Sequence, residues 1–319
     1  MKKLIVLLLA FAMVGAVSAQ VTTAIALSGG VTLVNEAGQS IFARDGSGTD
    51  TITFKGSEKD GKYGFSIGYK NVLNDANTNT FGTLSSWNAW YLGNYAKYKV
   101  GLGLGNSTFR TALYKYWKTS FGRLDGISGY GVSAESTKLG DLVVGAFIPV
   151  PEAATNSIEM FKGADLGAKY TLKGIGVAQA YVDLATGANK VGLGFTYTGV
   201  KNLTAAAITS LGFEAKNYRF GASVKYTGVE KLTLALQGSD SLIAGANAFN
   251  VYAEGGYDVT DAIFASAWAK FVSTGNVFTA GAFVDYSFAN GLTLEANGGY
   301  DFAAKAANAD LTLYYSVSF

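Results

Sequence analysis

The side chains that could do chemistry in this chain are mainly carboxylates, because its 319 residues include neither histidine nor cysteine. Without these two residue types, Ser-His-Asp and Cys-His nucleophilic sites are impossible, as are the usual zinc and haem ligations. Paired carboxylates could still hydrolyse a glycosidic bond, and the candidates are Glu254, Asp285, Glu295 and Asp301. We interpret these four as hydrated charges inside the protein and expect no enzymatic activity, cofactor or metal site.

The elements that position these residues are predicted to be strands, because apolar and polar side chains alternate along them. In 217–226 the aromatic and aliphatic side chains of Tyr218, Phe220 and Val224 alternate with Arg219, Ser223 and Lys225. Successive side chains of a strand point to opposite faces, so this pattern predicts one apolar and one polar face. The predicted strands are 309–319, 291–301, 277–287, 262–271, 248–257, 231–238, 217–226, 202–210, 189–198, 175–184, 164–172, 141–149, 127–135, 108–117, 97–105, 86–93, 62–70, 51–57 and 22–34.

A tyrosine marks the same point of each hairpin in the second half of the chain. The series is Tyr170, Tyr197, Tyr226, Tyr257, Tyr286 and Tyr315, about 29 residues apart. One such period holds two strands of about ten residues, the length that crosses a bilayer when tilted. The pattern predicts an all-β fold, a transmembrane antiparallel up-and-down β-barrel with about 16–18 strands. Bacterial single-chain barrels carry an even number of strands, so one of the nineteen runs is expected to be wrong, with 70–97 the suspected region.

The N-terminus is predicted to be a secretory signal peptide, residues 1–19. Lys2 and Lys3 form its positive region, 4–17 its apolar core, and 17–19 a small-residue cleavage site before Gln20. The alternative, a transmembrane anchor, would need about 20 apolar residues. Residues 20–319 are then expected to form the barrel.

Charged residues are predicted to line the inside of the barrel, since Lys or Arg facing lipid would cost about 2–4 kcal/mol near the bilayer midplane. The predicted lining residues are Lys62, Lys70, Lys99, Lys169, Arg219, Lys225, Lys231, Glu254, Lys270, Asp285, Glu295 and Asp301. A barrel of 16–18 strands is too wide for side chains to fill and leaves an aqueous channel. Excluding Lys2 and Lys3, basic and acidic residues balance, which gives no electrostatic argument for nucleic acid.

The C-terminal stretch alternates through 309–319 and stops on Phe319. Together with the signal peptide and the tyrosine-marked hairpins, this ending resembles Gram-negative outer-membrane β-barrel proteins of the porin class. The resemblance covers nearly the whole chain but singles out no individual family. It implies that the assembly machinery reads the strand ending at Phe319, and that ions and small hydrophilic solutes diffuse passively through the pore.

The resemblance also implies a loop that folds inward to narrow the pore, and a homotrimer embedded in outer-membrane lipid. The loop 150–163, with Glu152 and Glu159, is the candidate constriction, and the alternative is an ordinary surface loop. Two other functions stay open. The chain could be a surface protein whose outer loops bind a host or phage partner, with the barrel serving only to hold these loops in the membrane. It could also be a soluble secreted β protein.

Overall fold

The computed structural model describes residues 19–34, 43–45, 50–58, 60–70, 83–105, 107–113, 128–150, 163–184, 189–214, 216–289 and 291–318. Residues 1–18 of the predicted signal peptide, the loop residues Glu152 and Glu159, and the terminal Phe319 lie outside the described residues.

The described residues form nineteen strands and one short 3₁₀ turn, η1 (Ser107–Phe109). The strands are β1 (Ala19–Val34), β2 (Ala43–Asp45), β3 (Asp50–Glu58), β4 (Tyr63–Lys70), β5 (Thr83–Leu92), β6 (Ala96–Gly105), β7 (Ser128–Ser136), β8 (Leu142–Pro149), β9 (Asp165–Leu172), β10 (Gly176–Asp183), β11 (Lys190–Tyr197), β12 (Leu203–Gly212), β13 (Asn217–Val229), β14 (Leu232–Ile243), β15 (Ala246–Asp258), β16 (Ile263–Val272), β17 (Val277–Ser287), β18 (Leu292–Asp301) and β19 (Ala306–Ser318). Among the described residues, no helix is long and apolar enough to cross a membrane.

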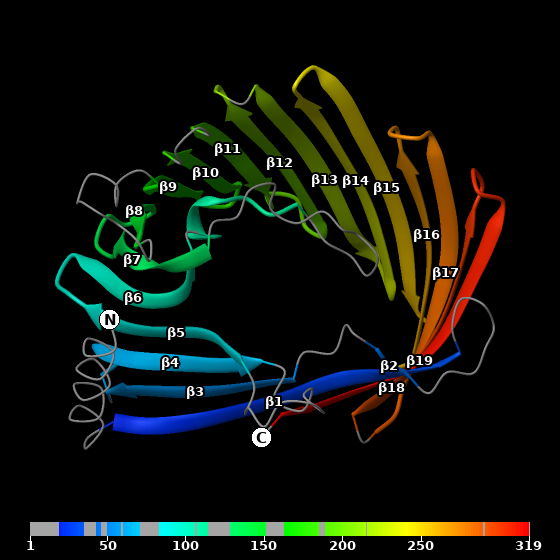
Figure 1. Ribbon diagram of the computed structural model, residues 1–319, viewed down its shortest axis with the longest axis horizontal. Coiled ribbons are helices and arrows are strands. Elements are labelled where there is room, and N and C mark those ends of the chain that lie inside the picture. Colours follow the sequence, from blue (N-terminus) through cyan, green and yellow to red (C-terminus); the bar gives the residue numbers. More distant parts are fainter. Residues whose placement is uncertain are drawn as a thin grey trace.

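Each strand from β3 to β19 pairs antiparallel with the next, and β1 joins the two ends of the series. Residues 19–27 of β1 pair with β3, while 26–34 pair with β19 in a register that sets Ala26 opposite Ser318. The three-residue β2 pairs with β1 beyond β3 on the same edge, so β2 and β3 together occupy one strand position. Figure 1 shows the strands arranged around a central opening. The predicted antiparallel up-and-down barrel is confirmed.

The wall is lower on one side than on the other. Strands β8, β9, β10 and β11 have eight residues each, whereas β13, β14 and β15 have 12 or 13. At about 3.3 Å per residue, the first group spans about 26 Å and the second about 40 Å. The tall strands are the olive and yellow arrows of Figure 1.

The two faces of the wall have opposite polarity. Large apolar side chains stand exposed on the outer face, such as Phe220 at 48%, Leu236 at 54% and Val251 at 42%. Polar residues at the alternate positions are buried on the inner face, including Ser223 and Gln237. Strand alternation therefore sorts apolar groups outward and polar groups inward.

One predicted strand, 108–117, is wrong over its described part, 108–113, and each of the eighteen other predicted strands overlaps an observed one. Residues 107–109 form η1, and 110–113 have no strand structure. The preceding strand β6 has a bulge where it pairs with β7, between Gly101 and Leu104, and Gly103 there has φ 76°. Glycine adopts this left-handed conformation without steric cost, and a bulge bends its strand. The suspected error near 70–97 is absent where the structure describes it, since 83–92 form β5.

Candidate functional site

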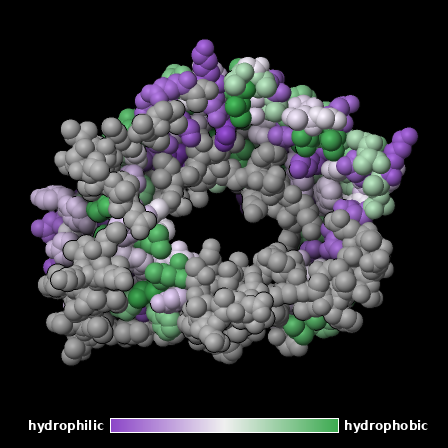
Figure 2. All heavy atoms as spheres, in the orientation of Figure 1, coloured by the Kyte–Doolittle hydropathy of each residue, from purple (hydrophilic) through white to green (hydrophobic). Residues whose placement is uncertain are grey.

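The inner face of the barrel is the candidate site, because polar side chains from most strands gather there. The buried ones are Ser133, Asp165, Asp183, Ser210, Ser223, Gln237, Glu254, Ser266, Asp285, Glu295 and Thr312. Figure 2, which draws every heavy atom as a sphere, shows that the middle of the ring is open. The inner face therefore borders a through-going space, as expected for a barrel of this strand number.

A segment of the chain, residues 107–113, lies inside the barrel against the low wall; we call it the inward segment. Phe109, Arg110, Thr111 and Leu113 are all buried. In Figure 1 it is the teal stretch, with its short helical turn, on the inner side of the green strands. The bulge at the end of β6 precedes it and redirects the chain toward the inside.

Arg110 anchors the inward segment to the wall. Its guanidinium forms an ion pair and hydrogen bond with Asp165 at the start of β9, and both side chains are at most 2% exposed. The guanidinium carbon lies 3.6 Å from the centre of the Tyr181 ring on β10, a cation–π arrangement. A buried charge is tolerated when it is paired and hydrogen-bonded. This contact therefore fixes the position of the inward segment on the inner face of the wall.

Hydrogen bonds from β10 continue the attachment on both sides of Arg110. The hydroxyl of Thr111 donates to Gln179 Oε1 at 2.7 Å, and Gln179 Nε2 donates to the backbone carbonyl of Thr108 at 2.6 Å. A single glutamine thus holds two points of the inward segment. Leu113 then packs on Ala206 and Ile208 of β12 in a small apolar cluster.

Glycines on the inner face make the space that the inward segment occupies. A Cβ atom at Gly167 would lie 2.2 Å from the Phe109 ring, and one at Gly145 would lie 2.8 Å from it. Gly145 and Gly167 face each other across β8 and β9. Further along, a Cβ at Gly194 would meet Thr111 at 2.1 Å. Side chains at these positions would occupy the place of the segment.

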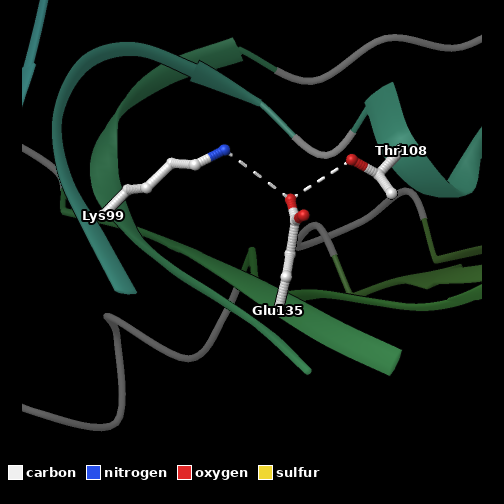
Figure 3. Close-up of polar contacts among 3 residues, drawn as sticks. All are labelled: Lys99, Thr108 and Glu135. Carbon is white, nitrogen blue, oxygen red and sulfur yellow. Dashed lines mark hydrogen bonds and ion pairs between the residues drawn. The ribbon is translucent and has the colours of Figure 1, made fainter. Parts of the chain in front are cut away.

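The inward segment also reaches the charged wall on its other side, at Glu135 of β7. Thr108 Oγ1 donates to Glu135 Oε1 at 3.2 Å, and Lys99 Nζ of β6 lies 3.9 Å from the same oxygen. Figure 3 shows the lysine and the threonine pointing at one carboxylate from opposite sides. Lys99 and Glu135 are 30% and 20% exposed, so this pair borders the open space.

On the tall side of the barrel, buried carboxylates occupy the wall. Glu254 of β15 accepts hydrogen bonds from Tyr252 Oη and Ser266 Oγ, both at 2.7 Å. Asp285 and Glu295 face each other across β17 and β18 and are about 5% exposed. In the part of the chain that the structure describes, no group of three acidic side chains could hold a metal ion.

The other predicted lining residues lie at several heights of the wall. Lys169, Arg219, Lys225 and Lys270 share the inner face with the buried polar residues of their strands, and Arg219 Nε donates to Asn217 at 3.3 Å. Lys62 and Lys231 are exposed in turns at strand ends. Asp301 ends β18 and accepts hydrogen bonds from two backbone amides. For Lys70 the structure describes the strand position alone.

Reasoning from the sequence missed Arg110, Phe109, Thr111 and Asp165 as site residues. The sequence did hold one signal, a set of glycines at inner-face positions of neighbouring strands. Glycines there leave space beside the wall, and this space is occupied by the inward segment. The sequence did not predict that residues 107–113 lie inside the barrel. The constriction predicted for 150–163 falls almost wholly outside the described residues and stays a prediction.

The fold matches solved structures of bacterial outer-membrane porins. OpdK of Pseudomonas aeruginosa, solved with vanillate, aligns over 94% of this chain and 99% of its own, with a TM-score of 0.58 at 11% identity. OccAB3 of Acinetobacter baumannii aligns over 95% and 100%, with a TM-score of 0.56 at 12% identity. A mutant of the Rh. blastica porin aligns over 93% and 100%, with a TM-score of 0.53 at 13% identity.

No protein-family model matches the chain, and no curated protein matches its sequence at a significant level. The structural matches cover 93–95% of this chain, and over that length it has the fold of the porin-class barrels. The structural neighbours are channels rather than enzymes.

Proposed function

We propose that this chain is an outer-membrane porin, a water-filled channel for passive diffusion of ions and small hydrophilic solutes. The observation that carries the proposal is the reversed polarity of the wall. Apolar side chains such as Phe220, Leu236 and Val251 are exposed outside, while Ser223 and Gln237 are buried inside. An apolar outer band suits lipid, and a polar interior with an open centre suits water.

The inward segment narrows this channel from one side. Its buried anchor at Arg110 holds it against the low wall, while Lys99 and Glu135 present both signs of charge beside it. Charged side chains at a narrow point set ion selectivity. Because both signs stand together here, we expect weak selectivity. The predicted lining residues, from Lys62 to Asp301, would tune the field along the rest of the pore.

The remaining sequence-based expectations belong to the same proposal. The mature chain would begin at Gln20 after removal of the signal peptide 1–19, and the assembly machinery would read the strand ending at Phe319. The barrel would sit in the outer membrane as a homotrimer. The loop 150–163, with Glu152 and Glu159, stays a candidate constriction loop.

Current through purified protein in a planar lipid bilayer tests the proposal. We expect discrete, persistent conductance steps, and a reversal potential across a salt gradient that gives the selectivity. Protein that is folded and inserted but carries no current would overturn the proposal. That result would favour the alternative of a surface protein whose outer loops bind a host or phage partner.

A further inference from the structure

The inner wall contains a cavity of about 450 Å³ on the side of the barrel opposite the inward segment's attachment. It lies where β16, β17, β18 and β19 run side by side. Its lining combines two aromatic residues, Trp268 and Tyr300, with three residues that have polar side chains, namely Thr279, Asp301 and Asn308. Ligand pockets typically show this composition, an apolar surface with a few placed polar groups.

The floor of the cavity is the indole of Trp268, which lies over bare backbone. Trp268 pairs with Gly281 across β16 and β17, and Gly281 pairs with Gly299 across β17 and β18. A Cβ atom would lie 2.7 Å from the indole at Gly281 and 3.4 Å from it at Gly299. The indole therefore extends over β17 toward β18, in space that is free because Gly281 and Gly299 have no side chains.

A second aromatic ring holds the indole in place. Tyr252 of β15 is nearly parallel to Trp268, with an angle of 7° between the rings and 6.4 Å between their centres. Tyr252 is itself buried, and its hydroxyl donates to Glu254 at 2.7 Å. Trp268 is half-buried, so it keeps an accessible surface in a fixed orientation.

The polar groups form a rim beside this surface. Thr279 pairs with Lys270 on one side and with Asp301 on the other, so a cation, a hydroxyl and a carboxylate follow one another across three strands. Asp301 Oδ1 accepts hydrogen bonds from the amides of Ala303 and Ala304, both at 2.9 Å, which fixes the carboxylate. Asn308 lies opposite Gly299 and brings its amide next to the indole.

We propose that this cavity binds a neutral cyclic sugar during its passage. The indole offers a flat apolar surface to the C–H face of a pyranose ring, and the rim offers donors and acceptors to its hydroxyls. Asp301 of the lining is balanced by Lys270, which lies outside the lining but pairs with Thr279, so the surroundings of the cavity carry no net charge to attract an ion. The inference rests on the proposed function, because a solute reaches this cavity from the pore.

The test is single-channel current in a planar bilayer with D-glucose added to the bath. Mannitol serves as a polyol without a ring face, and benzoate as a ring without hydroxyls. We expect glucose to interrupt the current at concentrations where mannitol and benzoate do not. Trp268→Leu should weaken the effect of glucose about tenfold, because stacking on an aromatic side chain is lost. Trp268→Phe, which keeps an aromatic face, should weaken it less.

Trp90→Leu is the matched control. Trp90 also lies over an inner-face glycine, since a Cβ at Gly64 would be 2.3 Å from its ring, but it does not line this cavity. This variant should respond to glucose like the wild type. Equal responses to glucose and mannitol, a response to benzoate alone, or full glucose sensitivity in Trp268→Leu would each overturn the inference. Absence of any channel current without sugar would instead count against the proposed function.

Discussion

The low and tall sides of the barrel fill their inner faces in different ways. On the low side, β8 and β9 present Gly145 and Gly167 to the interior, and Phe109 of the inward segment covers them. On the tall side, β14 and β15 present their own buried polar side chains, including Gln237 and Glu254. On the low side the inner face of the sheet is therefore covered by a separate segment of the chain. On the tall side it is covered by side chains of the strands themselves.

From this difference we expect the constriction on the low side, where the glycines lie, and not on the tall side, where the buried glutamate lies. Where glycines leave gaps among the inner side chains of the wall, there is room for a segment, and we expect that segment to narrow the pore from that side. Where the wall carries glutamate and glutamine, these side chains are buried and fill the inner face themselves. Variants on the low side should then change both stability and current, and variants on the tall side should change stability alone.

The largest effect is expected for Arg110→Ala on the low side. The substitution leaves Asp165 buried without its ion-pair partner, so we expect the free energy of unfolding to fall by about 3–5 kcal/mol. Urea unfolding of the protein in detergent micelles measures this change. Lys173→Ala is the control, because its ion pair with Asp141 at 3.2 Å is exposed and should contribute about 0–1 kcal/mol. Equal losses in the two variants would contradict the anchoring role of Arg110.

Gly167→Ala should act next most strongly, by pushing Phe109 off the wall. The added Cβ atom would lie 2.2 Å from the Phe109 ring, and we expect a loss of about 1–3 kcal/mol from overpacking. Gly238→Ala on the tall side is the matched change, since its nearest neighbour lies 3.8 Å away. Thermal unfolding followed by circular dichroism should separate the two. A Gly167→Ala protein as stable as Gly238→Ala would show that the glycine does not make space for the segment.

Glu254→Gln probes the tall side. The amide oxygen can still accept one hydrogen bond from Tyr252 or Ser266, but the charge-assisted bonds are lost, and we expect about 1–2 kcal/mol of destabilisation. Conductance should stay at the wild-type value, because the carboxylate is buried in the wall. Urea unfolding and single-channel recording on one sample test both halves. A large change in conductance with unchanged stability would contradict the expectation that the tall side affects stability and not current.

Glu135→Gln should have the smallest effect on stability. Its contacts with Lys99 at 3.9 Å and Thr108 at 3.2 Å are partly exposed, so we expect a change of about 1 kcal/mol or less. Loss of a negative charge beside the inward segment should move the reversal potential toward anion selectivity. An unchanged reversal potential would place the narrowest point elsewhere in the pore.

Most of the wall could be predicted from the sequence, because strand alternation is a local signal. Every observed strand except the short β2 overlaps a predicted one, including β5 (83–92), which was predicted at 86–93 inside the region suspected to hold the error. The stretch 108–117 was misread because Phe109, Thr111 and Leu113 alternate with other residues as a strand would. In the fold these side chains contact the inner wall of distant strands, and an alternation pattern carries no information about such contacts.

The candidate site was predictable in part for the same reason. The side of a strand on which Lys99, Glu254 or Asp285 lies follows from its position in the alternation. The pairing of Arg110 with Asp165, 55 residues apart, depends on where the inward segment crosses the wall. The position of the inward segment on the wall depends on inner-face glycines of strands that are remote from it in sequence.

Single-channel current in planar bilayers, compared between the wild-type protein and the double variant Phe109→Ala, Arg110→Ala, tests the channel function and its constriction together. We expect stable, discrete steps for the wild type and larger, flickering steps for the variant, whose inward segment has lost its anchor. Absence of current from folded, inserted wild-type protein would contradict the channel function. Identical steps from the two proteins would contradict the constricting role of residues 107–113.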